Sequence, residues 1–354
     1  MAEAGDKSGL AVEGAKAVYD RLVNDRAPYI TRAEKNAQYT VPSVFPKESD
    51  NGSTNFVTPY QSVGARGLNN LASKLLLSLF PVGEPFFKLN INEFALKQVG
   101  DPEVLQQAQI GLSLVERVAM RYIEGAGFRP TVFELAKQLL VAGNGLLYLP
   151  PQEQKVKLYK LQAYVVERDT LGGVIQTVTK DTMAAVNLPE DIRDALGIEV
   201  DKDPSAKVDI YTHCYRDSES DQWLAYQEVN GNIVESTRNT FPKDANPFIP
   251  VRLYKVDGES YGRSFVEEYL GDLVSLENLS QSIVEFAQAA SKVLFLVAPQ
   301  GQTSARRLTR APNGGFVAGR KEDISVFQLE KYNDFQVAKS TADGIESRLA
   351  SPSC

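Results

Sequence analysis

The chain has 354 residues, of which 43% are hydrophobic and 23% charged, and its formal net charge is −7. This composition is typical of a folded globular chain with room for about two or three domains, and it excludes the disordered and collagen-like classes. With only two cysteines, Cys214 and Cys354, and no leading apolar segment, nothing favours secretion or a disulfide framework, and synthesis in a reducing cytosol is expected.

Helices separated by an extended connection are expected in the first part of the chain. Apolar residues at helical spacing predict a helix over about residues 9–41, which Pro28 should end or kink. Residues 42–60 are rich in Pro, Ser, Asn and Gly and predict an extended connection. A second helix is expected up to Pro81, and its apolar stretch, interrupted by Lys74, is too short to span a membrane.

The middle of the chain changes from helical spacing to alternation. A strand is predicted at 86–91, followed by helices over about 101–124 and 131–142. From Leu146 onward, short alternating stretches separated by Gly and Asp predict an α+β body. The expected strands are 146–150, 157–161, 164–169, 173–181, 208–215, 222–229 and 232–237, with a helix near 188–196 and a loop insertion at 199–206.

Residues suited to catalysis are scarce. The one histidine, His213, cannot build a catalytic triad or a multi-histidine metal site, and its alternating surroundings predict an ordinary strand residue. Residues 9–16 have the glycine spacing of a phosphate loop but an alanine where the lysine belongs. The glycine pairs at 125–127 and 143–145 indicate turns, and the adjacent glutamates at 267–268 do not face each other on a helix. We therefore expect no enzyme activity, no metal and no cofactor.

The last third of the chain predicts two helices around a small β module. Apolar residues recur every three or four positions from about 264 to 291, which predicts a rod of about 28 residues and about 42 Å. Residues 293–301 form an apolar segment rich in residues that favour strands, and a hairpin-like stretch is expected to follow as far as Leu329. Helical spacing resumes over 335–350.

Basic residues gather in this β module. Residues 292–321 hold six basic residues and no Asp or Glu, so the segment carries +6 while the rest of the chain carries −13. Such a cluster suits contact with phosphate or with an acidic partner, and repetition around a ring would multiply it. Any DNA contact should be independent of sequence, and a solvated basic loop with no polyanion is the other interpretation. The candidate DNA or partner contacts are Lys292, Arg306, Arg307, Arg310, Arg320 and Lys321.

Several long stretches together resemble one known family. They lie at 19–33, 63–81, 141–150, 188–196, 257–279, 306–309 and 319–331, and include DGESYGRSFVEEYLGDLVSLENL and GRKEDISVFQLEK. On these residues the chain resembles the portal, or head-to-tail connector, proteins of T7-like short-tailed bacteriophages. The resemblance extends from about Gly9 to Leu349.

The resemblance implies an α+β portal fold with a mixed α/β wing, long stem helices, a small β-rich clip and a crown. Because relatives continue beyond residue 354, it also implies that the crown is missing and leaves ring closure by this form open. The expected domains are an N-terminal helical arm and extended connection (1–55), an α+β wing or body (56–256), a first stem helix (257–291), a clip (292–334) and the start of a second, truncated stem helix (335–354).

The family's role further implies a viral ring of about twelve subunits at one capsid vertex. That ring would conduct double-stranded DNA during packaging and ejection, while a separate terminase motor hydrolyses ATP. The implied partners are the terminase large subunit, a tail adaptor, the major capsid and scaffold proteins and internal core proteins, without a membrane. The protein would be made in the host cytoplasm and reside in the virion.

Two alternatives from other classes stay open. One is a structural capsid or scaffold protein without a DNA channel. The other is a packaging ATPase or nuclease, which the missing phosphate-loop lysine and the single histidine disfavour. For the basic residues themselves, contact with DNA and contact with a protein partner or a neighbouring subunit are both compatible with the sequence.

Overall fold

A computed structural model describes residues 13–90, 102–151, 153, 155–189, 192–193, 206–291, 294–327 and 332–350. The chain divides into two compact units. The first comprises residues 1–58 and 64–270, and the second comprises residues 59–63 and 271–354. Each unit is considered by itself below.

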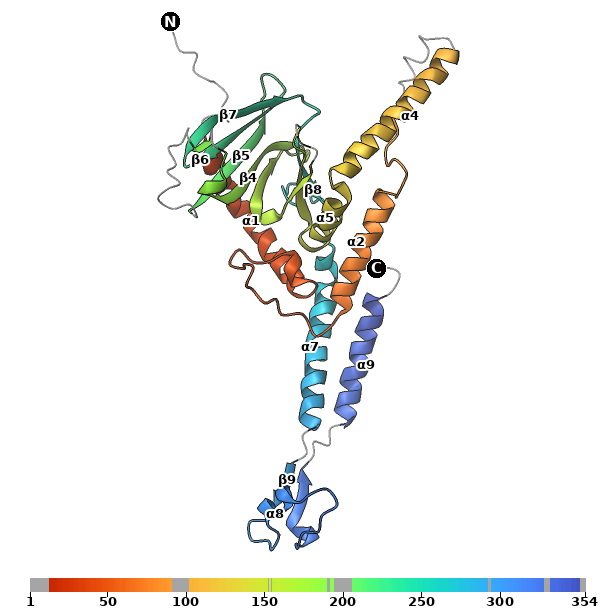
Figure 1. Cartoon of the computed structure of the whole chain (residues 1–354), viewed down its shortest axis with the longest axis vertical. Helices are drawn as coiled ribbons and strands as arrows, with labels where there is room; N and C mark the ends of the chain where they lie inside the picture. Colours follow the sequence, from red (N-terminus) through yellow and green to blue (C-terminus); the bar gives the residue numbers. More distant parts are fainter. Residues whose placement is uncertain are drawn as a thin grey trace. The chain divides into compact units, whose positions relative to one another are not determined.

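The described part of the first unit combines helices with two antiparallel sheets (Figure 1). Its helices are α1 (Ala15–Gln38), η1 (Pro42–Val44), α2 (Val63–Leu79), α4 (Pro102–Gly125), α5 (Phe128–Ala142), η2 (Leu161–Ala163), η3 (Ala185–Asn187) and the beginning of α7 (Val266–Ala290). Its strands are β1 (Asn144–Tyr148), β2 (Lys157–Tyr159), β3 (Tyr164–Arg168), β4 (Val174–Ala184), β5 (Lys207–Arg216), β6 (Trp223–Val229), β7 (Asn232–Phe241) and β8 (Phe248–Arg252).

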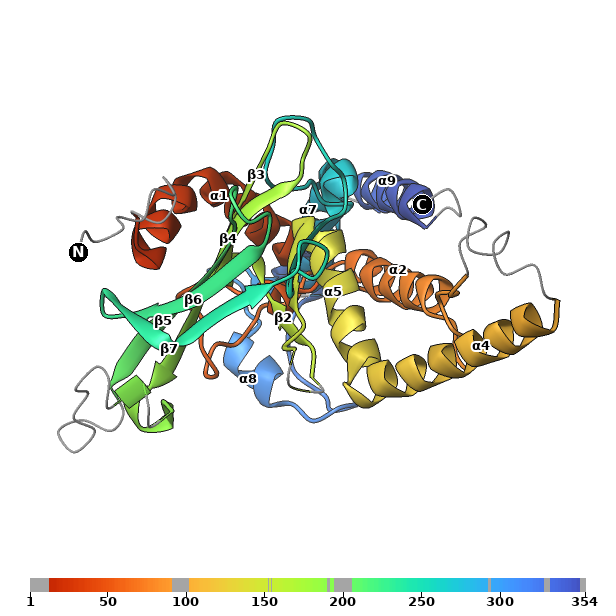
Figure 2. The same cartoon turned by 90° about the horizontal axis from the view of Figure 1, so that it is seen from above.

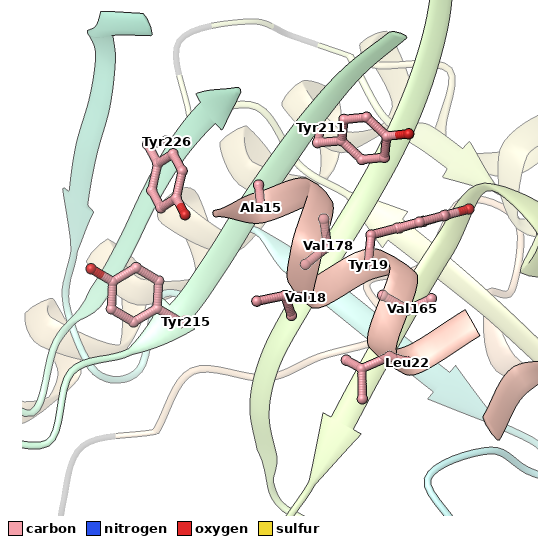
Figure 3. Packing of buried hydrophobic residues seen from close by; sticks show 9 residues of the cluster. All are labelled: Ala15, Val18, Tyr19, Leu22, Val165, Val178, Tyr211, Tyr215 and Tyr226. Carbon is pink, nitrogen blue, oxygen red and sulfur yellow. The ribbon is translucent and has the colours of Figure 1, made fainter. Parts of the chain in front are cut away.

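The larger sheet has the order β3-β4-β5-β6-β7, and α1 covers one of its faces (Figure 2). Helical spacing places one side of α1 on this face, where it meets residues from β3, β4, β5 and β6 (Figure 3). The rings of Tyr19 and Tyr211 meet edge to face with centroids 5.3 Å apart. The buried cluster comprises Ala15, Val18, Tyr19, Leu22, Val165, Val178, Tyr211, Tyr215 and Tyr226.

Arg26 links α1 to the edge of this sheet through backbone carbonyl groups. Its buried Nη1 lies 2.7 Å from the carbonyl oxygen of Gln162 and 2.8 Å from that of Tyr164. The guanidinium also lies over the ring of Tyr19. The guanidinium and the Tyr19 hydroxyl, which donates to the Gln162 carbonyl at 3.1 Å, together supply hydrogen-bond donors to the turn into β3.

The smaller sheet has the order β2-β1-β8, and α5 leads directly into its central strand. Gly143 ends α5 with a φ of +73°, and a Cβ there would lie 2.5 Å from the carbonyl carbon of Arg263. Next to it, the Asn144 amide donates to the Gly262 carbonyl at 2.9 Å and accepts from the Gly262 N–H at 2.7 Å. Two stretches that carry the family resemblance, 141–150 and 257–279, therefore cross here in backbone contact.

Polar contacts with α1 position the segment that enters α7. The Tyr29 hydroxyl donates to Glu259 at 2.5 Å, and the same carboxylate pairs with Arg263. Burial, aided by that carboxylate, raises the pKa of Tyr29 to about 12. Asn36 donates to Ser264 Oγ at 2.8 Å, two residues before α7 begins.

Most sequence-based expectations for this unit are confirmed, and four need comment. Residues 86–90 form no strand, because Phe86 instead packs against Phe80 and Phe128. The helix α1 continues through Pro28 rather than ending there. Strand β8 was not expected. The expected helix near 188–196 and the insertion at 199–206 fall largely outside the described residues.

Helix α4 carries apolar residues on two adjoining faces. One face is partly covered and includes Met120, which is buried. The other leaves large apolar side chains about half exposed, although the sequence places them at helical spacing. These are Val104, Ile110, Leu114, Val115, Val118 and Tyr122. An apolar stripe of this kind is more extensive than the scattered exposed residues of a typical monomer surface.

The second unit pairs two long helices around a small β module. Its described elements are the part of α7 from Gly271, β9 (Leu294–Val297), α8 (Ala305–Arg310), η4 (Lys321–Asp323), β10 (Ile324–Phe327) and α9 (Tyr332–Leu349). Figure 1 shows α7 and α9 side by side, with β9 and α8 beyond the end of α7. The expected order of helix, β module and helix is confirmed, whereas α8 interrupts a stretch expected to be hairpin-like.

Candidate partner and nucleic-acid interface

The α7–α9 pair is held by a narrow apolar seam. Leu276, Ala342 and Ile345 are buried between the helices, with Leu279 and Ile283 partly buried beside them. These residues recur every three or four positions on each helix, which is the spacing that places side chains on one helical face. Close to this seam, near the C-terminal end of α9, the exposed side chain of Arg348 lies 2.8 Å from Asp272.

Residues 294–327, which lie between α7 and α9 in the sequence, form the β module. Strands β9 and β10 pair antiparallel, with Val297 opposite Ile324 and Leu294 opposite Phe327. The long connection between these strands returns to the start of β10, where the Ala298 N–H donates to the Asp323 carbonyl at 2.9 Å. The pairing therefore brings both ends of the connection together.

A buried threonine closes the base of this connection. Thr303 Oγ1 accepts from the Arg320 N–H at 2.7 Å and donates to the Asp323 carboxylate at 2.9 Å. The same carboxylate accepts from the Thr303 N–H at 3.0 Å. A Cβ at Gly319 would lie 2.5 Å from the Thr303 hydroxyl, so the close approach favours glycine there. We refer to this set as the Thr303–Asp323 contact.

Helix α8 presents arginines to solvent from the closed connection. Arg306, Arg307 and Arg310 are exposed, and their i, i+1 and i+4 positions put Arg306 and Arg310 one above the other. Among the described residues, none of the three forms an ion pair with an Asp or Glu side chain. Their charges are therefore uncompensated within the described part of the chain.

These three arginines line an open depression of about 860 Å³, called here the arginine hollow. Its remaining lining includes Pro312, Phe316 and Val317 and contains no acidic residue. Phe316 is fully exposed on a loop that follows a tight turn. The hollow thus combines positive charge with uncovered apolar surface.

The candidate basic residues fall into three groups. Arg306, Arg307 and Arg310 come together in the hollow, whereas Arg320 and Lys321 lie at the entry to β10 and do not line it. Lys292 lies outside the described residues. In the sequence all six belong to one charged segment, and the described structure separates the first three from the next two.

The sequence pattern predicts neither the apolar side of the hollow nor the Thr303–Asp323 contact at the base of the connection. Nothing in the local pattern around Thr303 and Asp323 shows that they meet, because they are 20 residues apart in the chain. Helix α8 has weak signals of its own: Ser304 at the N-cap position and Pro312 shortly after the end. At six residues it is too short for periodicity to reveal it.

The side chains outside the β module that could take part in catalysis or metal binding have structural roles in the sheet. His213 lies in β5 with Tyr226 and Gln176 as hydrogen-bond partners, and burial lowers its pKa to about 4. Burial also raises the pKa of the Cys214 thiol to about 12, which disfavours a reactive thiolate. The described residues contain no group of three or more His, Cys, Asp or Glu that could hold a metal ion. No helix within the described ranges is long and apolar enough to cross a bilayer.

Comparison with known proteins identifies the family. Residues 12–351 match the model of the bacteriophage head to tail connecting protein family. The chain belongs to this family. It is 55% identical to the portal protein of Escherichia phage T7 over 350 residues and 55% identical to that of Enterobacteria phage T3 over 349 residues. Each match covers 97% of this chain and 65% of the relative. The chain therefore spans a little under two thirds of the length of these relatives.

Among solved structures, a chain from the virion of a native gene transfer agent particle is similar with a TM-score of 0.33 and 13% identity. That match covers 64% of this chain and 56% of the other. Family membership accordingly rests on the sequence matches, which confirm the resemblance to T7-like connectors. The mixed helices and sheets confirm the α+β class. Membership of a connecting-protein family also supports the expectation that the chain is not an enzyme.

Proposed function

We propose that this protein is a subunit of a portal ring of about twelve copies at one vertex of a phage capsid, through which double-stranded DNA passes during packaging and ejection. The observation that carries the proposal is the match of nearly the whole chain to the head-to-tail connecting family. Ring formation would repeat one contact, between two different surfaces of the subunit, at every pair of neighbouring copies. The protein would reside in the virion after synthesis in the host cytoplasm.

Within this proposal, the expected domains correspond to parts of the structure. The first unit would contain the helical arm (1–55) and the α+β wing (56–256). Residues 257–291 would be the first stem helix, 292–334 the clip and 335–354 the start of the second stem helix. The seam of Leu276, Ala342 and Ile345 supports a paired-helix stem.

The exposed stripe on α4 supports an oligomer. Half-exposed side chains such as Ile110, Leu114 and Val118 would stabilise an oligomer if a neighbouring subunit covered them. Each Å² of apolar surface removed from water contributes about 25 cal/mol. A chain that remained a monomer would keep that surface in water. The stripe therefore fits a subunit better than it fits an isolated protein.

The β module supports a docking role at the ring's clip. Arg306, Arg307, Arg310, Arg320 and Lys321 add positive charge to an otherwise acidic chain, and a ring would repeat that charge in every copy. A conduit should hold DNA weakly, because each neutralised phosphate adds affinity through counterion release and would slow translocation. We propose that the clip meets the terminase large subunit first and the tail adaptor later, with capsid, scaffold and internal core proteins contacting other parts of the ring.

Imaging and packaging assays test the proposal. Negative-stain electron microscopy of the purified phage gene product should show rings with a central hole, and mass photometry should give their subunit number. Replacing Arg306, Arg307 and Arg310 with Glu in the phage gene should leave rings intact while reducing DNA packaging or tail attachment. Monomers or closed shells without a bore would support the alternative of a scaffold or capsid protein. ATPase or nuclease activity that purified with the chain would support an enzyme.

A further inference from the structure

We propose that the arginine hollow binds an acidic segment of a protein partner that also inserts an apolar side chain, and that it does not serve as a DNA contact. The inference rests on the proposed function, since it assigns a partner chemistry to the docking surface of the β module. It separates Arg306, Arg307 and Arg310 from Arg320 and Lys321, which do not line the hollow.

The charge of the hollow fits carboxylates. Three guanidinium groups project from six residues of α8, and the lining offers them no acidic partner. Neighbouring like charges raise the energy of the unbound surface, and an arriving anion relieves it. Guanidinium groups pair with carboxylates through two parallel hydrogen bonds, so closely spaced Asp and Glu side chains could engage several arginines together.

The apolar side of the hollow favours protein over duplex DNA. Phe316 is fully exposed beside Val317 and Pro312, although burying an aromatic ring of this size is strongly favourable. A partner's aromatic or aliphatic side chain would cover these residues, whereas a phosphate backbone presents charge to them. A hollow of about 860 Å³ has the size of a site for a few side chains, and the convex rod of a duplex would rest on its rim.

The walls of the hollow are formed before any partner arrives. Gly314, with a φ of +81°, lies in a turn closed by the Gly315 N–H donating to the Pro312 carbonyl at 2.9 Å. This turn leads into Phe316, and the Thr303–Asp323 contact closes the base of the connection. A preformed site loses less conformational entropy on binding, so a short segment could bind measurably.

Fluorescence anisotropy with a labelled probe peptide tests the inference. The probe is a short unstructured peptide of Asp, Glu and Ser with one central Trp, and its binding to the purified protein is measured. We expect the double substitution Arg306→Glu and Arg310→Glu to weaken binding by roughly tenfold or more. Phe316→Ala should weaken it by about threefold to tenfold, and replacing the Trp of the probe with Ala should have a similar effect.

Matched controls use the basic residues outside the hollow. The double substitution Arg320→Glu and Lys321→Glu changes the charge of the same module by the same amount. It should reduce the affinity for the probe peptide by less than the substitution of Arg306 and Arg310 does. Equal losses in the two double variants would show general attraction of polyanions and overturn the inference. So would tighter binding of a labelled DNA duplex than of the peptide, or no binding of the peptide at all. Ring imaging is independent of these outcomes: intact rings without peptide binding would refute the hollow's role and leave the proposed function standing.

Discussion

Acidification should destabilise the larger sheet through one buried side chain, His213. Its ring is fully buried in β5, with the Tyr226 hydroxyl donating to Nδ1 at 3.2 Å and Nε2–H donating to Gln176 Oε1 at 2.8 Å. These bonds satisfy the neutral ring, and burial, helped by the charge of Arg21, lowers its pKa from 6.5 to about 4. The unfolded chain therefore binds a proton near pH 6.5, whereas the folded chain binds it only near pH 4.

The sign and size of the effect follow from this difference. Stability falls as the pH drops from 6.5 towards 4 and the loss then levels off, with a total of about 3 kcal/mol and about 2 kcal/mol already lost at pH 5. Urea unfolding at pH 7.5 and 5.0, followed by the fluorescence of Trp223, measures it, because this single tryptophan lies in β6 of the same sheet.

The variant His213→Gln provides the control, since it titrates nowhere in this range. It should be less stable at pH 7.5 and should lose about 2 kcal/mol less than the native chain on moving to pH 5.0. Equal losses in the two proteins would show that carboxylates elsewhere cause the pH dependence. The assignment of the effect to burial of His213 would then be wrong.

Three further substitutions test the packing directly. Gly143→Ala should cost about 3 kcal/mol or more in urea unfolding, because its Cβ would meet backbone at 2.5 Å, whereas Gly127→Ala, with a similar φ and open space, should cost only about 1 kcal/mol. Thr303→Val should speed tryptic cleavage after the α8 arginines, and Thr341→Val, at an exposed hydroxyl in α9, should leave that cleavage rate unchanged. Leu276→Ala should destabilise the α7–α9 pair by about 2–5 kcal/mol, seen as faster hydrogen exchange in α9.

Sequence patterns predict the elements well where one period extends over many residues. Helix α7 and strand β5 both lie close to their expected positions, because each buries one regular face. Strand β8 escaped prediction because Pro250 lies within it, a residue tolerated here since β8 pairs on one side only, with β1. The false strand at 86–90 has the alternation of a strand, but its Phe86 ring packs into an aromatic cluster instead.

Of the candidate site, only the cluster of basic residues could be predicted from the sequence. A count of basic residues finds the β module, but it does not show that Arg306, Arg307 and Arg310 line one hollow. Nor does it show that Thr303 and Asp323, far apart in the chain, close the base of the connection. The exposure of Phe316 could not be predicted, because an isolated aromatic residue in a loop belongs to no periodic pattern that would indicate whether it is buried. Distinguishing Arg310 from Arg320 required the shape of the closed connection, which local propensity does not encode.

Shape and charge are carried by different residues in the β module, and this makes them separable by experiment. The contacts that close its connection come from backbone groups, Thr303 and Asp323, while the guanidinium groups of Arg306, Arg307 and Arg310 form no ion pair within the described chain. Charge reversal at the arginines should therefore alter the surface potential and leave the fold unchanged. Thr303→Val should do the opposite, loosening the hollow at constant charge. A partner attracted by charge alone would tolerate the second change, whereas a segment that also fills the hollow would be weakened by both.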